Sequence, residues 1–264
     1  MNLKLDRKIV FITGSTSGIG FAMAEGFLKE GAQVFINGRT QATVDKAVEK
    51  LKASGQNTAV SGIVADFKEA DAMDIIRKTI PKVDILINNV GIFSSQLFEE
   101  TTDSQWQEMF QVNVMSSVQL SRFFLPKMMA QNWGRILFVS SECAQLVPAD
   151  LIAYSTTKAA LLSLSRGLAQ TTKGTKVTVN ALIPGSTLTE GALNFLQEQA
   201  ENQGITEEQV AQEFFKSDRN SSLLQRFAEP KEIADMALFL SSPLSAATNG
   251  AAIKVDGGSI QGIL

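Results

Sequence analysis

The sequence predicts a doubly wound α/β protein, in which one parallel sheet carries helices on both faces. Short apolar segments rich in β-branched residues alternate with longer segments whose apolar residues recur at helical spacing. Parallel neighbours need crossover connections, and helices in these connections cover both faces of the sheet. The 264 residues suit one domain of this class, and no repeat or linker divides them.

Seven segments are predicted as strands. They cover residues 9–13, 33–37, 58–65, 83–88, 135–140, 176–183 and 252–256. The helices expected between them lie at about 18–30, 40–54, 68–79, 103–131, 153–172 and 230–241.

One segment, residues 187–225, departs from this alternation. It contains two helix-like pieces, near 189–202 and 206–217, and no strand. Because it follows the carboxyl end of a predicted strand, where open α/β sheets bind ligands, we expect a substrate lid. A peripheral helical hairpin that serves packing or assembly is the alternative.

Composition excludes several kinds of chemistry. The chain has no His and one Cys, Cys143, which excludes His-dependent nucleophile systems, zinc sites built on His or paired Cys, and an intrachain disulfide, so no metal is expected. The formal charge is −3, and no stretch gathers five or six basic residues, so nucleic acid is not an expected partner. No apolar run approaches the length of about 18 residues that spans a bilayer, so we expect no membrane association and a cytoplasmic location.

A glycine-rich turn follows the first predicted strand directly. Its residues are Thr13, Gly14, Ser15, Thr16, Ser17, Gly18, Ile19 and Gly20. Glycines let the backbone turn tightly and approach a pyrophosphate, and the following helix offers free N–H groups at its N-terminus. The turn therefore predicts a dinucleotide cradle.

The end of the second predicted strand bears on which dinucleotide binds. Residues 33–38 end without the carboxylate that accepts the ribose hydroxyls of NAD, and Arg39 follows. A guanidinium there is suited to a 2′-phosphate. NADP(H) is the preferred cofactor in this interpretation, with NAD(H) as the alternative.

The only tyrosine, Tyr154, precedes Lys158 by one helical turn, which places both on one helix face. A phenol has a pKa of about 10, and a neighbouring ammonium together with an oxidised nicotinamide would lower it. Ser141 ends the fifth predicted strand and could stabilise charge on a carbonyl oxygen.

Together these motifs resemble the short-chain dehydrogenase/reductase family over nearly the whole chain. They are Thr13-Gly14-x-x-x-Gly18-Ile19-Gly20, Asn88-Asn89-Val90-Gly91, Asn113, Ser141, Tyr154-x-x-x-Lys158, Pro184-Gly185 and Asp256-Gly257-Gly258. The resemblance implies one Rossmann-type domain over residues 1–264 with a seven-stranded parallel sheet, assembled as a homodimer or homotetramer. It would transfer a hydride between NADP(H) and a small-molecule carbonyl or alcohol substrate.

The resemblance also implies roles for individual residues. Tyr154 would donate the proton in reduction, and Ser141 would polarise the carbonyl. Lys158 would lower the pKa of the tyrosine and hold the nicotinamide ribose, while Asn113 would anchor a water that relays protons. Contacts are implied from Asp66 to adenine, from Asn89 near the adenosine ribose and from Thr189 to the carboxamide. The expected cofactor-binding set is Gly14, Ser15, Thr16, Ser17, Gly18, Ile19, Gly20, Arg39, Asp66, Asn89, Gly91, Tyr154, Lys158, Pro184, Gly185, Thr187 and Thr189.

Two residues depart from the family pattern: Val90 replaces the usual alanine, and Ser17 stands where many NADP-preferring relatives carry a basic residue. The substrate side is expected to be mainly apolar, without an Arg or Lys that clamps an anion. Its residues are Ile92, Phe93, Ala144, Gln145, Leu146, Val147, Leu151 and the segment from Leu188. Glu142 directly follows Ser141 and is expected to turn away into solvent, with a role in substrate recognition as the alternative.

Several functions are consistent with these features. The first is an NADPH-dependent ketone reductase, with the 3-oxoacyl carrier-protein reductases as one example. An NAD-dependent alcohol or sugar dehydrogenase is the second. An inactive cofactor-binding regulatory protein conflicts with the presence of all four catalytic-type residues, and an extended nucleotide-sugar enzyme conflicts with the short carboxyl-terminal region.

Overall fold

One parallel sheet of seven strands organises the molecule. The computed structural model describes residues 1–54 and 59–262. The strands are β1 (Ile9–Ile12), β2 (Gln33–Gly38), β3 (Val60–Val64), β4 (Ile85–Asn88), β5 (Gly134–Val139), β6 (Val177–Pro184) and β7 (Ala252–Val255). They lie in the order β3-β2-β1-β4-β5-β6-β7, and all pair in parallel. The predicted fold is confirmed; the first residue of the third predicted strand, Thr58, lies outside the described residues.

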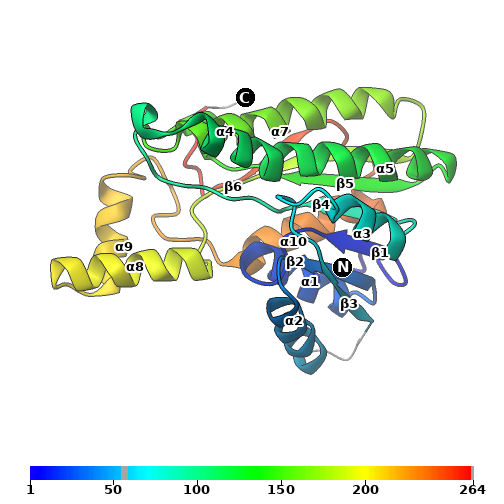
Figure 1. Cartoon of the computed structure of the whole chain (residues 1–264), viewed down its shortest axis with the longest axis horizontal. Coiled ribbons are helices and arrows are strands. Elements are labelled where there is room, and N and C mark those ends of the chain that lie inside the picture. The colour runs from blue at the N-terminus through cyan, green and yellow to red at the C-terminus, as the bar shows by residue number, and fades with distance from the viewer. Residues whose placement is uncertain (55–58, 263–264) are drawn as a thin grey trace.

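Helices cover both faces of the sheet, as Figure 1 shows. One layer contains α1 (Gly18–Lys29), α2 (Gln41–Ser54) and α10 (Pro230–Ser241), and the other contains α3 (Ala72–Thr79), α5 (Ser116–Ala130) and α7 (Ile152–Thr171). Two apolar cores result, one on each face, because the central strands β1, β4, β5 and β6 bury side chains in both directions. No helix in the described part of the chain is long and apolar enough to cross a membrane.

The helix predicted over residues 103–131 is interrupted. It consists of α4 (Asp103–Phe110), a π-helical segment at Gln111–Met115, and α5. Such wider turns occur inside helices and often lie at functional sites. The apolar period does not reveal the interruption because the helix axis continues through it.

Other short elements were also absent from the prediction. They are α6 (Cys143–Leu146) and the 3₁₀ turns Phe98–Glu100 and Pro243–Ser245. Three or four residues are too few to display a period.

The segment at 187–225 forms two helices close to the predicted positions, α8 (Glu190–Gln203) and α9 (Glu207–Lys216). In Figure 1 they project from one end of the sheet. A backbone bridge between Thr187 and Ala228 closes the base of this insertion. Its return path is fastened to the turn after β7, where the carbonyl of Gly257 accepts the N–H groups of Leu223 and Leu224 at 2.8 and 2.9 Å.

Asn37 joins the carboxyl ends of the first three strands. Its Oδ1 accepts the N–H of Gly14 at 3.1 Å, and its Nδ2 donates to the carbonyls of Ile63 and Ala65 at 3.2 and 3.0 Å. The side chain is almost completely buried. It therefore satisfies backbone groups that separating strands would otherwise leave unpaired.

Replacing this amide with a carboxylate tests the joint. Asn37→Asp keeps the shape but removes both N–H donors and turns a charge toward two carbonyls. We expect the free energy of unfolding to fall by about 2–4 kcal/mol. Urea unfolding followed by circular dichroism measures the loss. Asn194→Asp on exposed α8 makes the same chemical change and should cost almost nothing; equal losses in both variants would contradict the assigned role.

Candidate active site

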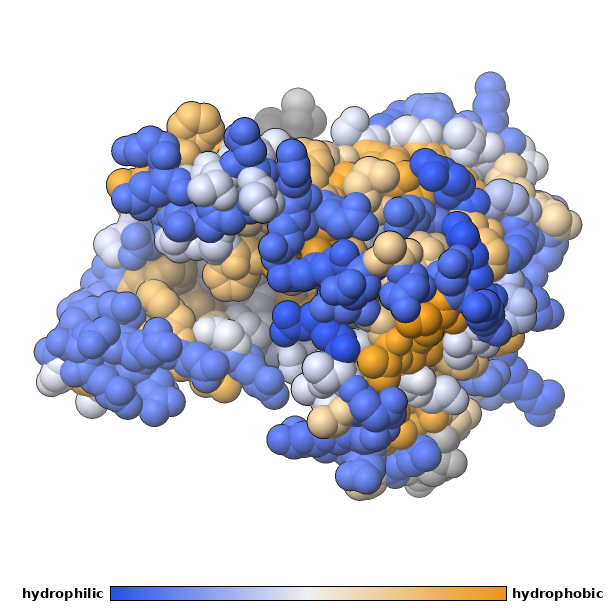
Figure 2. All heavy atoms as spheres, viewed as in Figure 1, coloured by the Kyte–Doolittle hydropathy of each residue, from blue (hydrophilic) through white to orange (hydrophobic). Residues whose placement is uncertain are grey.

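A cleft of about 600 Å³ opens at the carboxyl edge of the sheet. The order of the strands reverses between β1 and β4, which is where open α/β sheets bind ligands. Figure 2 shows a hollow between the body of the molecule and the projecting α8 and α9. Of the predicted residues, the cleft is lined by Gly14, Thr16, Ser17, Gly18, Ile19, Gly20, Arg39, Asp66, Asn89, Gly91, Ser141, Tyr154, Lys158, Pro184, Gly185, Thr187 and Thr189.

The glycine turn leaves room for a phosphate group. Gly14 and Gly18 have φ angles of 58° and 55°, and a Cβ at Gly14 would lie 2.9 Å from the Cα of Val90. Ser17 immediately precedes α1, but its hydroxyl makes no capping hydrogen bond to the helix. This hydroxyl therefore does not occupy the first N–H groups of α1. The turn thus fits a pyrophosphate.

Ser15 is a correction to the predicted set. It is fully buried, its hydroxyl donates to the carbonyl of Ile12 at 2.7 Å, and it accepts the N–H of Asn37 at 3.0 Å. Its own N–H donates to the carbonyl of Asn37 at 2.9 Å. These bonds hold the turn against β2 and leave the side chain no access to the cleft.

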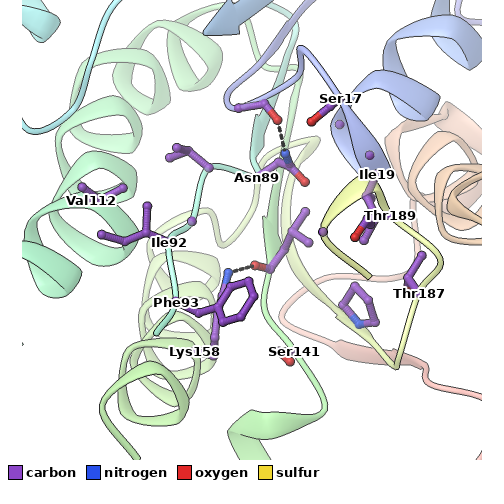
Figure 3. Close-up of a pocket in the computed structure, with 18 of the residues that line it drawn as sticks. Ser17, Ile19, Asn89, Ile92, Phe93, Val112, Ser141, Lys158, Thr187 and Thr189 are labelled. Atoms are coloured by element: carbon purple, nitrogen blue, oxygen red, sulfur yellow. Dashed lines mark hydrogen bonds between the residues drawn. The ribbon is translucent and has the colours of Figure 1, made fainter. Parts of the chain in front are cut away.

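Asn89 and Thr13 hold the glycine turn against the end of β4. The Nδ2 of Asn89 donates to the carbonyls of Thr13 and Gly14 at 2.9 and 2.8 Å. The hydroxyl of Thr13 accepts the N–H groups of Asn89 and Val90 at 2.9 and 3.0 Å. Figure 3 shows this amide beside the turn. Asn89 therefore shapes the floor of the cleft besides lining it.

Arg39 and Asp66 lie at the other end of the cleft, after β2 and β3. The Arg39 side chain is exposed and makes no hydrogen bond or ion pair within residues 1–54 and 59–262. One oxygen of Asp66 accepts the N–H of Lys68 at 3.0 Å. The free guanidinium is thus available to an anionic group of a ligand.

Lys158 lies in the interior of the cleft wall. Its Nζ donates to the carbonyl of Val139 at 2.9 Å (Figure 3). Its backbone carbonyl accepts the hydroxyl of Ser140 at 2.8 Å. The ammonium is 5.5 Å from the ring centre of Tyr154. Burial lowers the pKa of Lys158 to about 8.

The pKa of Tyr154 moves opposite to the expected direction. Burial raises the pKa of the phenol well above its ordinary value of 10.0, and a hydrogen bond with Ser141 opposes the shift. Among the described residues, Nζ of Lys158 donates to the carbonyl of Val139 and not to the phenol oxygen. In the protein alone the phenol therefore stays protonated, a state suited to proton donation.

Asn113 lies behind the cleft wall and does not line it. It belongs to the π-helical segment and is fully buried. Its Nδ2 donates to the carbonyl of Ile92 at 2.9 Å and to Thr157 at 3.0 Å, while its Oδ1 accepts the N–H of Ile92 at 2.8 Å. The side chain thus positions the loop after β4.

The substrate side of the cleft differs from the expectation. Ile92, Phe93 and Leu151 line it, and the ring of Phe93 packs edge-on against Tyr154 at 5.9 Å. Five other residues were predicted on the substrate side but do not line the cleft: Ala144, Gln145, Leu146, Val147 and Leu188. The chain turns into α6 at Cys143, and this turn carries the side chains of residues 144–147 away.

Glu142 is a second correction, because it is buried at 3% exposure. Its Oε1 accepts Nε of Arg219 at 2.8 Å and the hydroxyl of Ser186 at 2.9 Å. Arg219 also lines the cleft, so an arginine does reach the substrate side. The two partners are far apart in sequence and lie on different segments, and no local pattern connects them.

Within the described residues no three His, Cys, Asp or Glu side chains gather as a metal site.

Comparison with known proteins gives consistent matches. A family model described as short chain dehydrogenase matches residues 8–200. "Uncharacterized oxidoreductase YvrD" of Bacillus subtilis (strain 168) is 46% identical over 266 residues, covering the whole of both chains. The 3-oxoacyl-[acyl-carrier-protein] reductase of Aquifex aeolicus (strain VF5) is 32% identical over 98% of this chain and 99% of its own.

A solved structure matches over the same extent. L-Sorbose reductase from Gluconobacter frateurii, complexed with NADPH and L-sorbose, superimposes with a TM-score of 0.93 at 31% identity, covering 100% of both chains. The single parallel sheet of seven strands agrees with this match. The chain therefore belongs to the short-chain dehydrogenase family of oxidoreductases, which act on alcohol and carbonyl groups.

Proposed function

We propose that this oxidoreductase uses NADP(H) and works as a carbonyl reductase. Arg39 carries the proposal, because its free guanidinium lines the cleft where a 2′-phosphate would lie and no carboxylate stands at the end of β2. The NADPH complex of L-sorbose reductase from G. frateurii supports the same preference. The cradle of Gly14 and Gly18 accommodates the pyrophosphate.

The chain's own side chains divide the chemistry at the carbonyl. A bound nicotinamide supplies the hydride. The buried phenol of Tyr154 donates the proton to the carbonyl oxygen, and the hydroxyl of Ser141 donates a hydrogen bond to the same atom. After proton transfer, the Lys158 ammonium stabilises the phenolate across the 5.5 Å to its ring. Asn113 does not reach the substrate; it positions the loop after β4 through two hydrogen bonds to the backbone of Ile92.

An NAD-dependent alcohol or sugar dehydrogenase is the second candidate, favoured by one observation. Ser17, at the start of α1, provides no positive charge to the cleft.

We also infer that the insertion of α8 and α9 serves as a substrate lid. We also propose a cytoplasmic location, on the apolar pattern of the sequence, and assembly as a homodimer or homotetramer, as the family resemblance implies.

Removing the guanidinium tests the cofactor preference. In Arg39→Ala we expect the KM for NADPH to rise about tenfold or more, since a charge-assisted bidentate contact is lost, while the KM for NADH changes less than about twofold. Steady-state kinetics with both cofactors measure this. Arg122→Ala, which removes an exposed arginine outside the cleft, is the matched control. An unchanged KM for NADPH would overturn the preference.

Removing one oxygen tests the proton donor. Tyr154→Phe should lower kcat by about a thousandfold or more while NADPH binds with nearly unchanged Kd, because only the transferable proton is lost. Single-turnover absorbance at 340 nm and NADPH fluorescence separate the two quantities. Phe98→Leu trims an exposed ring outside the cleft and should retain most of the turnover. Substantial kcat in Tyr154→Phe would reject the role.

The lowered pKa of Lys158 predicts a pH dependence of cofactor binding. Below a pH of about 8 the amine is charged in the free protein, and above it the amine is neutral. Because an anionic cofactor favours the charged form, binding at higher pH requires proton uptake. The Kd for NADPH should therefore rise by up to about tenfold per pH unit above that value.

Fluorescence titrations between about pH 7 and pH 9.5 measure this dependence. In Lys158→Met the rise should disappear, and Lys50→Met on the exposed side of α2 should retain it. A Kd for the unaltered protein that stays flat over this range would contradict the assignment.

A further inference from the structure

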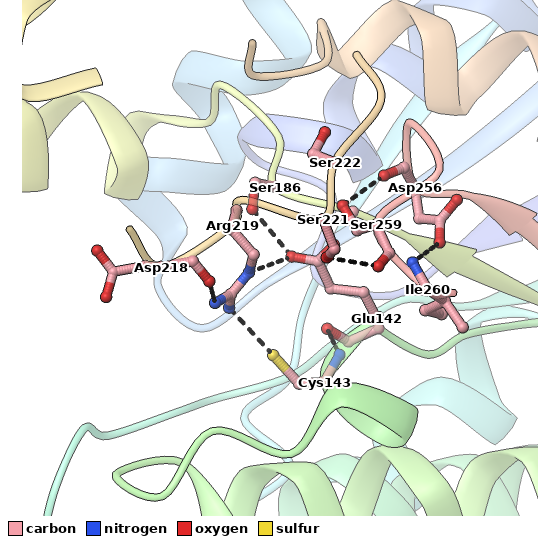
Figure 4. A network of polar contacts seen from close by, with 12 residues as sticks. Glu142, Cys143, Ser186, Asp218, Arg219, Ser221, Ser222, Asp256, Ser259 and Ile260 are labelled. Carbon is pink, nitrogen blue, oxygen red and sulfur yellow. Dashed lines mark hydrogen bonds and ion pairs between the residues drawn. The ribbon is translucent and has the colours of Figure 1, made fainter. Parts of the chain in front are cut away.

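An ion pair joins the end of the catalytic strand to the insertion. Glu142 directly follows Ser141, and Arg219 follows α9; their Oε1 and Nε atoms are 2.8 Å apart. Their side chains are 3% and 14% exposed, so both charges are largely removed from water. Figure 4 shows the pair between the two segments, with the hydroxyl of Ser186 donating to the same carboxylate oxygen, Oε1.

The pair leaves hydrogen-bonding capacity unused. The Oε2 atom of Glu142 is buried and has no hydrogen-bond partner among the described residues. Arg219 donates through Nε to Glu142, through Nη1 to the carbonyl of Asp218, and through Nη2 only to the sulfur of Cys143 at 3.9 Å. A guanidinium has five N–H donors, so some remain for another group. A buried carboxylate oxygen without a partner is costly, and a ligand that donates to it would remove that cost.

The location and net charge of the pair restrict what that ligand can be. Glu142 and Arg219 line the same cleft as Ser141 and Tyr154, on the substrate side. Together they carry no net charge, so a carboxylate attracted by Arg219 would be repelled by Glu142. A hydroxyl group both donates and accepts a hydrogen bond, and it can use both partners without a charge of its own. An acyl chain could use neither.

We propose that Glu142 and Arg219 determine substrate specificity by binding a hydroxyl group next to the reacting carbonyl. The substrate class is then an uncharged polyhydroxy ketone, with the corresponding polyol as the product of its reduction. Phe93 and Leu151 line the same side and pack against its carbon chain. This inference rests on the proposed carbonyl reduction and adds the identity of the substrate class.

The test compares two four-carbon ketones, erythrulose in both enantiomers and 2-butanone. Erythrulose is too short to close a stable ring, so both present an open-chain carbonyl and differ in their hydroxyl groups. The measured quantity is the ratio of kcat/KM for erythrulose to kcat/KM for 2-butanone, with NADPH. Comparing this ratio between variants cancels the intrinsic reactivity of each ketone.

The principal variant is Glu142→Gln, and Glu198→Gln on exposed α8 is its matched control. We expect Glu142→Gln to lower the ratio by about tenfold to a hundredfold, chiefly through the KM for erythrulose, since the substrate hydroxyl then meets a neutral amide instead of a charged acceptor. Glu198→Gln should leave the ratio unchanged. Because Glu142→Gln leaves Arg219 buried without its counter-ion, the double variant Glu142→Gln/Arg219→Gln, which removes both charges, is measured beside it.

Three results would overturn the proposal. They are equal losses for both ketones in both variants, an unaltered protein that prefers 2-butanone, and turnover of neither ketone by protein that binds NADPH. The last leaves the cofactor assignment intact, because NADPH fluorescence measures it separately. Reduction of 2-butanone alone would likewise support carbonyl reduction while rejecting hydroxyl recognition.

Discussion

The cleft depends on the way three polar side chains satisfy backbone groups at the carboxyl edge of the sheet. Asn37 joins the ends of β1, β2 and β3, while Thr13 and Asn89 hold β1 against β4. At this edge the chain leaves the strands for the connections that follow them, and the N–H and carbonyl groups just beyond the strands have no partners within the sheet. Side-chain amides and hydroxyls supply those partners. The glycine turn is thereby held open with its geometry fixed before any ligand arrives.

Burial has a different role on the catalytic side of the same cleft. It lowers the pKa of Lys158 to about 8 and raises that of Tyr154, so both groups are displaced toward their neutral forms. The protonated phenol suits donation, and the lysine stays close enough to its titration range to respond to a bound anion. Glu142 and Arg219 are buried as well, but each compensates the charge of the other.

Several features of this site are local in sequence and were predictable for that reason. The glycine turn lies within one strand-to-helix connection, and Tyr154 and Lys158 share one helical turn. Arg39 is the residue immediately after β2, so its position at the edge of the sheet follows from the end of that strand. The seven strands and most helices were likewise evident from period alone, apart from the π-helical segment within residues 103–131 and α6.

Contacts between distant segments were outside the reach of such patterns. Ser15 stands inside the glycine motif, yet Asn37 of the next strand captures its hydroxyl. Alternation along a strand end directs Glu142 outward, but the fold brings Arg219 to it from the insertion and makes an inward orientation stable. The sequence by itself determined the fold class, the nucleotide turn and the Tyr and Lys pair, because those follow from residue types at fixed local spacing. Only the tertiary structure decided which polar groups are buried, what neutralises them and how their pKa values shift, because solvent exclusion and charge compensation depend on neighbours that the chain brings together only when folded.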